Sequence, residues 1–185
     1  MSSDGLGLAL LARARNAIAA EFGFAAVPEP GHPALEKAGA TFVTLTQEGE
    51  LRGCIGSLEA RRPLDADVRA NAQAAAFSDP RFMPLAQAEF ARTRVEVSLL
   101  TPATPLEFSD ETDAISCLRP GVDGVILEYG SHRATFLPQV WDSLPDPRQF
   151  LSHLKRKAGL PADFWADGIK LSRYEVQKWK EVEKS

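Results

Sequence analysis

The feature that constrains the fold most is a pair of short strand-like runs separated by turn residues, which occurs twice in the chain. Residues 41–46 are β-branched and aromatic, residues 47–50 favour a turn, and residues 51–55 form the returning run. The same arrangement recurs further along, where the two runs and the turn are residues 125–129, 133–137 and 130–132. Because hairpins pair antiparallel, the sequence predicts an α+β fold with a mainly antiparallel sheet and flanking helices.

The segments outside the hairpins add three helices and two strands to this prediction. The expected helices cover residues 6–22, 63–77 and 147–158, with apolar residues at helical spacing. The helix over residues 147–158 has the clearest start and stop signals, since Asp146 can cap it in a capping box with Gln149 and Gly159 can end it. Residues 94–100 alternate apolar and polar and predict a half-buried strand, and residues 169–179 predict one long strand.

Composition excludes several classes of protein. The 185 residues are 44% hydrophobic and 25% charged, which is ordinary for a globular chain and unlike disordered, collagenous or coiled-coil proteins. No apolar run approaches the ~20 residues needed to span a bilayer. The net charge of −4 argues against a protein whose main role is to bind RNA or DNA. Two cysteines are too few for a disulfide scaffold or a structural zinc site, and we expect no bound metal.

The length predicts one domain, or two small ones that share a core. Residues 101–105, with two prolines, are the best candidate for a crossing between sub-domains. The apolar run at residues 6–12 is preceded by Asp4 and followed by Arg13 and Arg15. This order of charges is the reverse of that in a secretory signal, so we expect a cytoplasmic protein.

Residues 51–56, with the sequence LRGCIG, are the most unusual stretch. On a strand, side chains two apart share a face, so Arg52 and Cys54 are expected to point the same way. Gly53 and Gly56 weaken a strand and often mark a bulge or the close approach of another group. A nearby cation stabilises a thiolate, so the pair could form a nucleophile or an anion site. The alternative is a small apolar cysteine in the core beside a surface arginine.

Other polar residues are weaker candidates. Asp79 and Arg81 flank Pro80, where they could bind a substrate anion or simply form a turn with a salt bridge. Glu89 and Glu96 could act as a general base if either lies in a cleft, and a solvated carboxylate is the alternative for both. The three histidines, His32, His132 and His153, are expected to be structural or exposed. The sequence has no phosphate-binding loop or dinucleotide fingerprint, and we expect no cofactor.

The LRGCIG segment resembles the signature hexapeptide of the AMMECR domain family, whose prokaryotic members are called AmmeMemoRadiSam system protein A. Further segments resemble later blocks of the family in the same order along nearly the whole chain. These segments are Phe42–Leu45, Asp79–Phe82, Val97–Leu100, Gly121–Gly124, Leu137–Trp141, Lys157–Leu160 and Ile169–Tyr174.

The resemblance implies a single AMMECR domain over residues 1–185, in which a larger and a smaller sub-domain enclose a cleft near the hexapeptide. It implies a protein that binds, and could transform, a small anionic or carbonyl substrate, acting with Memo-family and radical SAM proteins. Cys54 is then the candidate catalytic nucleophile, and the candidate binding residues are Arg52, Gly53, Gly56, Asp79 and Arg81. The chain has no three-cysteine cluster motif, so it is not itself the radical enzyme.

Two alternatives to this interpretation stay open. In the first, the protein is a non-catalytic adaptor, the hexapeptide serves folding, and function lies in an interface with a partner. In the second, which the charge disfavours, the chain is an RNA- or DNA-binding module. Whether the protein is an enzyme is left open by the sequence.

Overall fold

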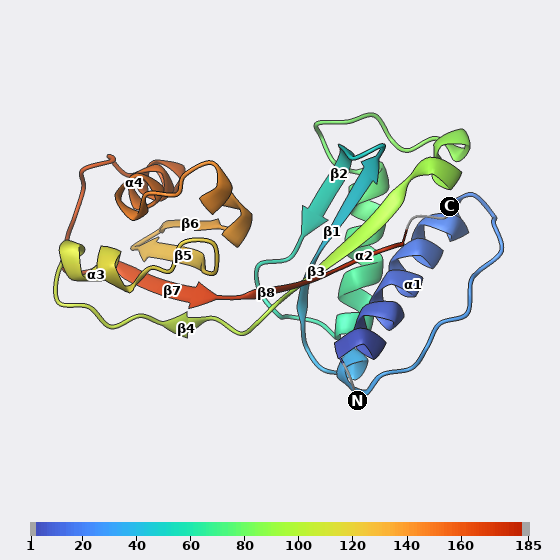
Figure 1. Cartoon of the computed structure of the whole chain (residues 1–185), viewed down its shortest axis with the longest axis horizontal. Helices are drawn as coiled ribbons and strands as arrows, with labels where there is room; N and C mark the ends of the chain where they lie inside the picture. The colour runs from blue at the N-terminus through green and yellow to red at the C-terminus, as the bar shows by residue number, and fades with distance from the viewer. Residues whose placement is uncertain (1–2, 183–185) are drawn as a thin grey trace. The chain divides into compact units, whose positions relative to one another are not determined.

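A computed structural model of the chain describes residues 3–182 and contains two compact units (Figure 1). The first unit comprises the residues up to Leu100 together with those from Gln177, and the second comprises Thr101–Val176. Each unit is built around one antiparallel four-stranded sheet, with strand orders β2-β1-β3-β8 and β4-β7-β5-β6. The predicted α+β fold class is therefore confirmed.

The first unit packs two helices against one face of its sheet. Helix α2 contacts β1 and β2, and helix α1 contacts α2 and β3 (Figure 1). The buried side chains of α2 are the apolar Leu64, Val68, Ala72, Ala75 and Ala76 and the polar Asp67 and Asn71. The elements of this unit are α1 (Ser3–Glu21), η1 (Pro33–Glu36), β1 (Ala40–Gln47), β2 (Glu50–Gly56), α2 (Leu64–Phe77), η2 (Gln87–Arg92), β3 (Arg94–Leu100) and β8 (Val176–Lys180), where η denotes a 3₁₀ helix.

The first predicted hairpin is present and contains one irregularity. Its turn residues Glu48 and Gly49 have φ values of 51° and 81°, the conformation that a tight two-residue turn requires. The register of β1 and β2 shifts between Leu45 and Thr46, so that Arg52 is an extra residue on β2. Such a bulge redirects side chains locally. The simple alternation that we expected for Arg52 and Cys54 therefore does not hold.

The second unit contains the second predicted hairpin and the helix with the clearest sequence signals at its two ends. Helix α4 begins at Pro147, where the Asp146 side chain accepts the N–H of Arg148 instead of forming a capping box with Gln149, and Gly159 follows it with φ of 87°. The sequence patterns did not predict β4 or α3. The elements of this unit are β4 (Thr104–Pro105), α3 (Glu111–Cys117), β5 (Gly124–Tyr129), β6 (His132–Phe136), η3 (Pro138–Asp142), α4 (Pro147–Lys157) and β7 (Lys170–Tyr174).

The expectation of one long strand over residues 169–179 is wrong. The segment forms two strands, β7 and β8, which belong to different sheets. The break falls at Glu175, whose N–H donates to the hydroxyl of Thr101 at 2.8 Å and whose carbonyl accepts the N–H of Thr101 at 2.8 Å. A strand-like pattern shows that a segment is extended, whereas it does not show which sheet pairs with it.

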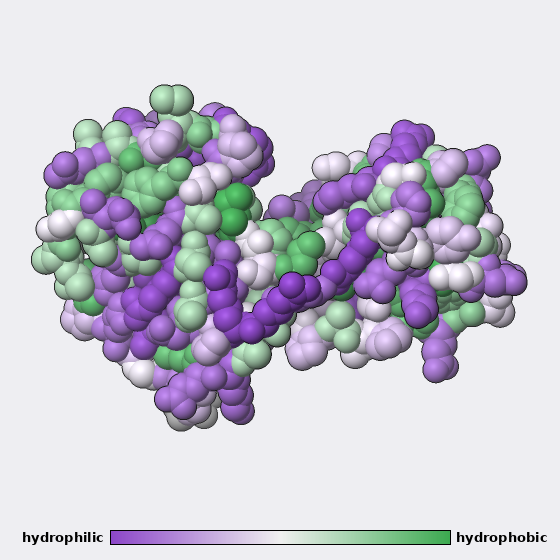
Figure 2. All heavy atoms as spheres, turned by 180° about the vertical axis from the view of Figure 1, so that it is seen from behind, coloured by the Kyte–Doolittle hydropathy of each residue, from purple (hydrophilic) through white to green (hydrophobic). Residues whose placement is uncertain are grey.

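The surface of both units mixes hydrophobic patches with hydrophilic side chains on the side shown in Figure 2. Of the helices between residues 3 and 182, none combines the length and the apolar character that crossing a membrane requires.

Candidate functional site

Cys54 lies on β2, at one edge of the first sheet. Its partner in register on β1 is Thr44, whose hydroxyl lies 3.4 Å from the Cys54 Sγ and donates a hydrogen bond to it. The thiol is half-buried. The sequence patterns did not indicate Thr44, because a cross-strand neighbour follows from the register and not from proximity along the chain.

Asp79 and Arg81 bind the backbone of Cys54. The Asp79 Oδ2 accepts the N–H of Cys54 at 2.9 Å, and the Arg81 Nη2 donates to the Cys54 carbonyl at 3.3 Å. The same two side chains bind each other, with the Arg81 Nε and Nη2 at 3.0 and 2.7 Å from the Asp79 carboxylate. The pair thus satisfies an edge-strand position that would otherwise have no neighbouring strand.

The ion pair shifts the pKa values of both Asp79 and Arg81. The hydrogen bond from Arg81 holds the pKa of Asp79 well below its usual range, against the opposing effect of burial, and the N–H of Cys54 adds to this lowering. The hydrogen bond to Asp79 raises the pKa of Arg81, and the charge of an ionised Cys54 contributes a smaller part. The Asp79–Arg81 pair therefore stays ionised on both sides at neutral pH.

Arg52, which we expected beside the thiol, is bound to Glu89 of η2. Its Nε and Nη2 donate to the two carboxylate oxygens of Glu89 at 3.0 Å each. Glu89 also accepts from Gln47 and from the N–H of Ala86. The carboxylate that was considered as a general base thus neutralises Arg52, which is the residue left without a register partner by the bulge in β2.

The Arg52–Glu89 pair makes stability depend on acid pH. Its hydrogen bonds, chiefly from Arg52 and then from Ala86, lower the pKa of Glu89 from 4.5 to about 2. Because the folded-state pKa is lowered, this stabilisation is complete above about pH 4.5 and is lost as the pH falls through about 2. We expect Glu89→Gln to be less stable at neutral pH and to lose less stability between about pH 5 and about pH 2.5 than the unmodified protein.

Urea unfolding midpoints at neutral and acid pH measure this difference. Glu50→Gln, which removes an exposed carboxylate from β2, is the control and should show the pH dependence of the unmodified protein. A parallel loss of stability in Glu89→Gln and the unmodified protein would contradict the assignment.

Packing explains both glycines of the hexapeptide. A Cβ at Gly53 would lie 2.1 Å from the carbonyl oxygen of Ala75, so that α2 packs directly on the β2 backbone. A Cβ at Gly56 would lie 2.2–2.4 Å from atoms of the Phe42 ring. The two positions, expected to bind a ligand, therefore have a structural role that needs no ligand.

The remaining candidates lie in other surroundings. Glu96 faces Thr44 in register on β3 and pairs with Lys178 and Lys180 at 3.9 and 3.5 Å. Two histidines have structural roles, since His32 caps η1 and the His132 Nδ1 bonds to the carbonyl of Ala158; His153 is exposed. Within residues 3–182, no group of three or more His, Cys, Asp or Glu side chains is arranged to hold a metal ion.

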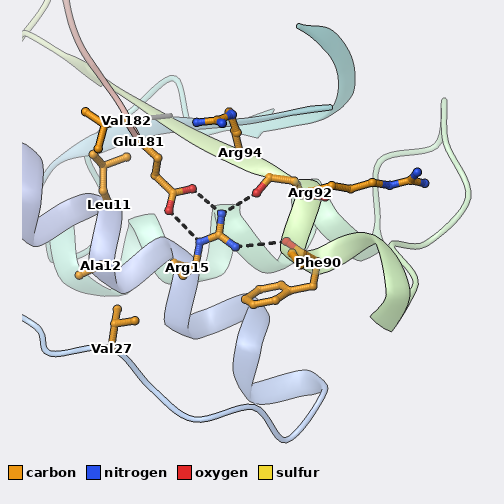
Figure 3. A pocket seen from close by; sticks show the side chains of 11 residues that line it. Leu11, Ala12, Arg15, Val27, Phe90, Arg92, Arg94, Glu181 and Val182 are labelled. Carbon is orange, nitrogen blue, oxygen red and sulfur yellow. Dashed lines mark hydrogen bonds and ion pairs between the residues drawn. The ribbon is translucent and has the colours of Figure 1, made fainter. Parts of the chain in front are cut away.

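A pocket of about 510 Å³ lies elsewhere in the first unit, between α1, η2 and the end of β8 (Figure 3). An ion pair of Arg15 and Glu181 crosses it, and Arg15 also donates to the carbonyls of Phe90 and Thr93. Glu181 accepts the N–H of Val95 at 2.7 Å. These groups bind one another and fasten the residue after β8 to β3, which is a structural role. None of the predicted site residues lines this pocket.

The fold and the site together define an α+β protein of two sheet-containing units, with the LRGCIG strand at the edge of the first sheet. The AMMECR1 family model matches residues 11–179, and the chain belongs to this family. Protein MJ0810 of Methanocaldococcus jannaschii is 42% identical in an alignment covering 72% of this chain and 68% of the relative. Protein SSO0193 of Saccharolobus solfataricus is 36% identical, with coverage of 97% and 83%.

A solved structure supports the fold. The crystal structure of uncharacterized protein PH0010 from Pyrococcus horikoshii superimposes with a TM-score of 0.81 at 32% identity, covering 95% of this chain and 91% of that one. The names of these relatives state no activity, so the comparisons establish the family and the fold.

Proposed function

We propose that the protein binds a small carbonyl compound at Cys54, with Arg81 as the hydrogen-bond donor to its oxygen. The observation that carries this proposal is the exposure of Arg81 beside the thiol. Asp79 fixes the guanidinium through Nε and Nη2, yet the side chain is 55% exposed. Among the described residues, Nη1 has no hydrogen-bond partner, so this donor is open to a ligand.

Charge favours a carbonyl group over an anion. Asp79 neutralises Arg81, and Glu89 neutralises Arg52, so the two guanidinium groups carry no excess charge between them. Neutralised cations keep their N–H donors but attract an anion less strongly. A neutral acceptor therefore fits the site better than the anionic substrate that was the other expectation.

The chemistry open to this site is addition of the thiol to the carbonyl carbon. The Cys54 sulfur forms a bond to that carbon, the C=O double bond becomes a single bond, and the thiol proton is transferred to the oxygen. The product is a hemithioacetal, and the step needs no oxidant or cofactor. The hydroxyl of Thr44 donates a hydrogen bond to the sulfur at 3.4 Å and so holds it in position for the attack.

Labelling with iodoacetamide, read by peptide mass, tests this proposal. Cys54 and Cys117 are both half-buried, so Cys117 is an internal control. We expect propionaldehyde and glyoxylate to slow the labelling of Cys54 by about threefold or more, and propionate, an anion without a reactive carbonyl, to have little effect. None of the three should protect Cys117.

Variants of two arginines sharpen the test. Arg81→Lys keeps the charge but removes the free Nη1, and should abolish most of the protection by propionaldehyde. Arg92→Lys changes an exposed arginine that lies 4.0 Å from Glu89 and should leave the protection unchanged. Protection by propionate alone, or equal protection of both cysteines, would contradict a carbonyl site at Cys54.

The adaptor function is the second candidate, and one observation favours it. Packing and strand capping account for Gly53, Gly56 and Asp79 without any ligand. On this alternative, Cys54→Ser retains full activity in a complementation assay. If Cys54 binds a carbonyl compound, the same variant loses activity.

The proposed partners are a Memo-family protein and a radical SAM protein, and the support for them is the family resemblance alone. Size-exclusion chromatography of the purified proteins from one genome tests the association. Co-elution with either protein is the expected result, and separate elution of all three at micromolar concentration would count against it.

A further inference from the structure

The Nη1 atom of Arg52 is a buried hydrogen-bond donor without a partner among the described residues. Within residues 3–182, it is the only buried side-chain nitrogen or oxygen without a hydrogen-bond partner. Glu89 occupies the other side of the guanidinium by binding Nε and Nη2. Buried donors without partners are rare in native proteins and often mark a place for a water molecule or a ligand.

Phe82 lies against both guanidinium groups of the site. Its ring centroid is 5.9 Å from the Cζ of Arg52 and 5.4 Å from the Cζ of Arg81, within the range of cation–π contact. The ring belongs to an irregular segment between α2 and η2, in which Arg81 and Met83 are exposed. One aromatic side chain on a segment outside helices and strands thus contacts two arginines.

We propose that Arg52 Nη1 is a second donor of the ligand site and that Phe82 is the lid over it. When the ring turns away, Nη1 donates to a carbonyl oxygen of the ligand. Because Glu89 already neutralises Arg52, a neutral oxygen acceptor satisfies this donor without leaving a charge unbalanced.

The two donors together narrow the class of ligand. One carbonyl group lies beside Cys54 and Arg81, as in the proposed function on which this inference rests, and a second oxygen lies at Arg52. The ligand is therefore a small neutral compound with two carbonyl oxygens. A compound with a single carbonyl group leaves Nη1 without a partner and should bind more weakly.

Modification by phenylglyoxal, an arginine reagent, tests the lid. We expect Arg52 to be protected in the unmodified protein and to react about tenfold faster in Phe82→Ala. Phe82→Tyr keeps the ring and should retain the protection. Met83→Ala changes the exposed neighbour and should also retain it. Thermal unfolding followed by circular dichroism identifies any variant that has lost its fold.

Competition tests the second donor. In Phe82→Ala, malonamide, which has two carbonyl oxygens, should slow the modification of Arg52 by about threefold, whereas acetamide and malonate should have smaller effects. Malonamide does not need to react with the thiol, so a failure of the Cys54 experiment leaves this outcome intact. Three results would overturn the inference. Phenylglyoxal could modify Arg52 rapidly in the protein without substitutions, or slowly in folded Phe82→Ala. Acetamide could also compete as well as malonamide.

Discussion

Asp67→Ala should lower the free energy of unfolding by about 3–5 kcal/mol, because it removes the centre of a buried polar network. The Asp67 side chain is 1% exposed. Its Oδ2 accepts the N–H and the hydroxyl of Thr41 at 2.8 and 2.7 Å, and its Oδ1 accepts from Ser57 and Arg62 at 2.6 and 2.8 Å. Alanine would leave these donors without a partner, two of them on the fully buried Thr41.

Urea unfolding measures the effect as a lower midpoint with an unchanged slope. The matched control is Asp4→Ala, which removes an exposed carboxylate from the first turn of α1 and should cost no more than about 1 kcal/mol. Equal effects of the two substitutions would show that the Asp67 network contributes little. The network ties β1 to α2, so its loss should also loosen the sheet on which the candidate site is built.

Gly53→Ala should destabilise the protein by about 3 kcal/mol through overpacking. The new Cβ would lie 2.1 Å from the Ala75 carbonyl oxygen, which is backbone and cannot rotate away. Either α2 or β2 must move, and β2 carries Cys54. We therefore expect the melting temperature to fall and the labelling rate of Cys54 to change together in this variant.

Gly31→Ala is the matched control for this substitution. Nothing lies within 4 Å of a Cβ at Gly31, and its backbone does not have a positive φ. The substitution should be neutral or should stabilise by about 0.5 kcal/mol through the unfolded state. If Gly53→Ala were as stable as Gly31→Ala, close packing would not explain the glycine of the hexapeptide.

Local signals predicted the elements that they directly encode. The β1–β2 hairpin follows from two strand-like runs around Gly49, and α4 follows from Pro147 and Gly159 at its two ends. These signals act within a few residues of the backbone that they shape, so one sequence is sufficient to find them. Asp67 lies in the first turn of α2 and bonds to Thr41, and no local signal indicates this contact because the partner comes from a distant strand.

The sequence indicated most residues of the candidate site, but it did not indicate which of them contact one another. Cys54, Asp79 and Arg81 do come together, although Asp79 lies 25 residues after Cys54 in the sequence. Arg52 was expected beside the thiol and instead pairs with Glu89, because this partner comes from η2, far along the chain. Thr44 and Phe82 were not among the candidate site residues, since each contacts the site only through the folded chain.

The sequence by itself determined the α+β class, the hairpins, most of the helices and the family, because these depend on local backbone preferences and on the order of residues along the chain. Only the tertiary structure decided which carboxylate neutralises which arginine and that residues 169–179 divide between two sheets. The physical reason is that ion pairs and strand pairing join groups distant in sequence, and their partners are selected by packing. The charge balance around Cys54, on which the proposed carbonyl ligand rests, belongs to this second kind of information.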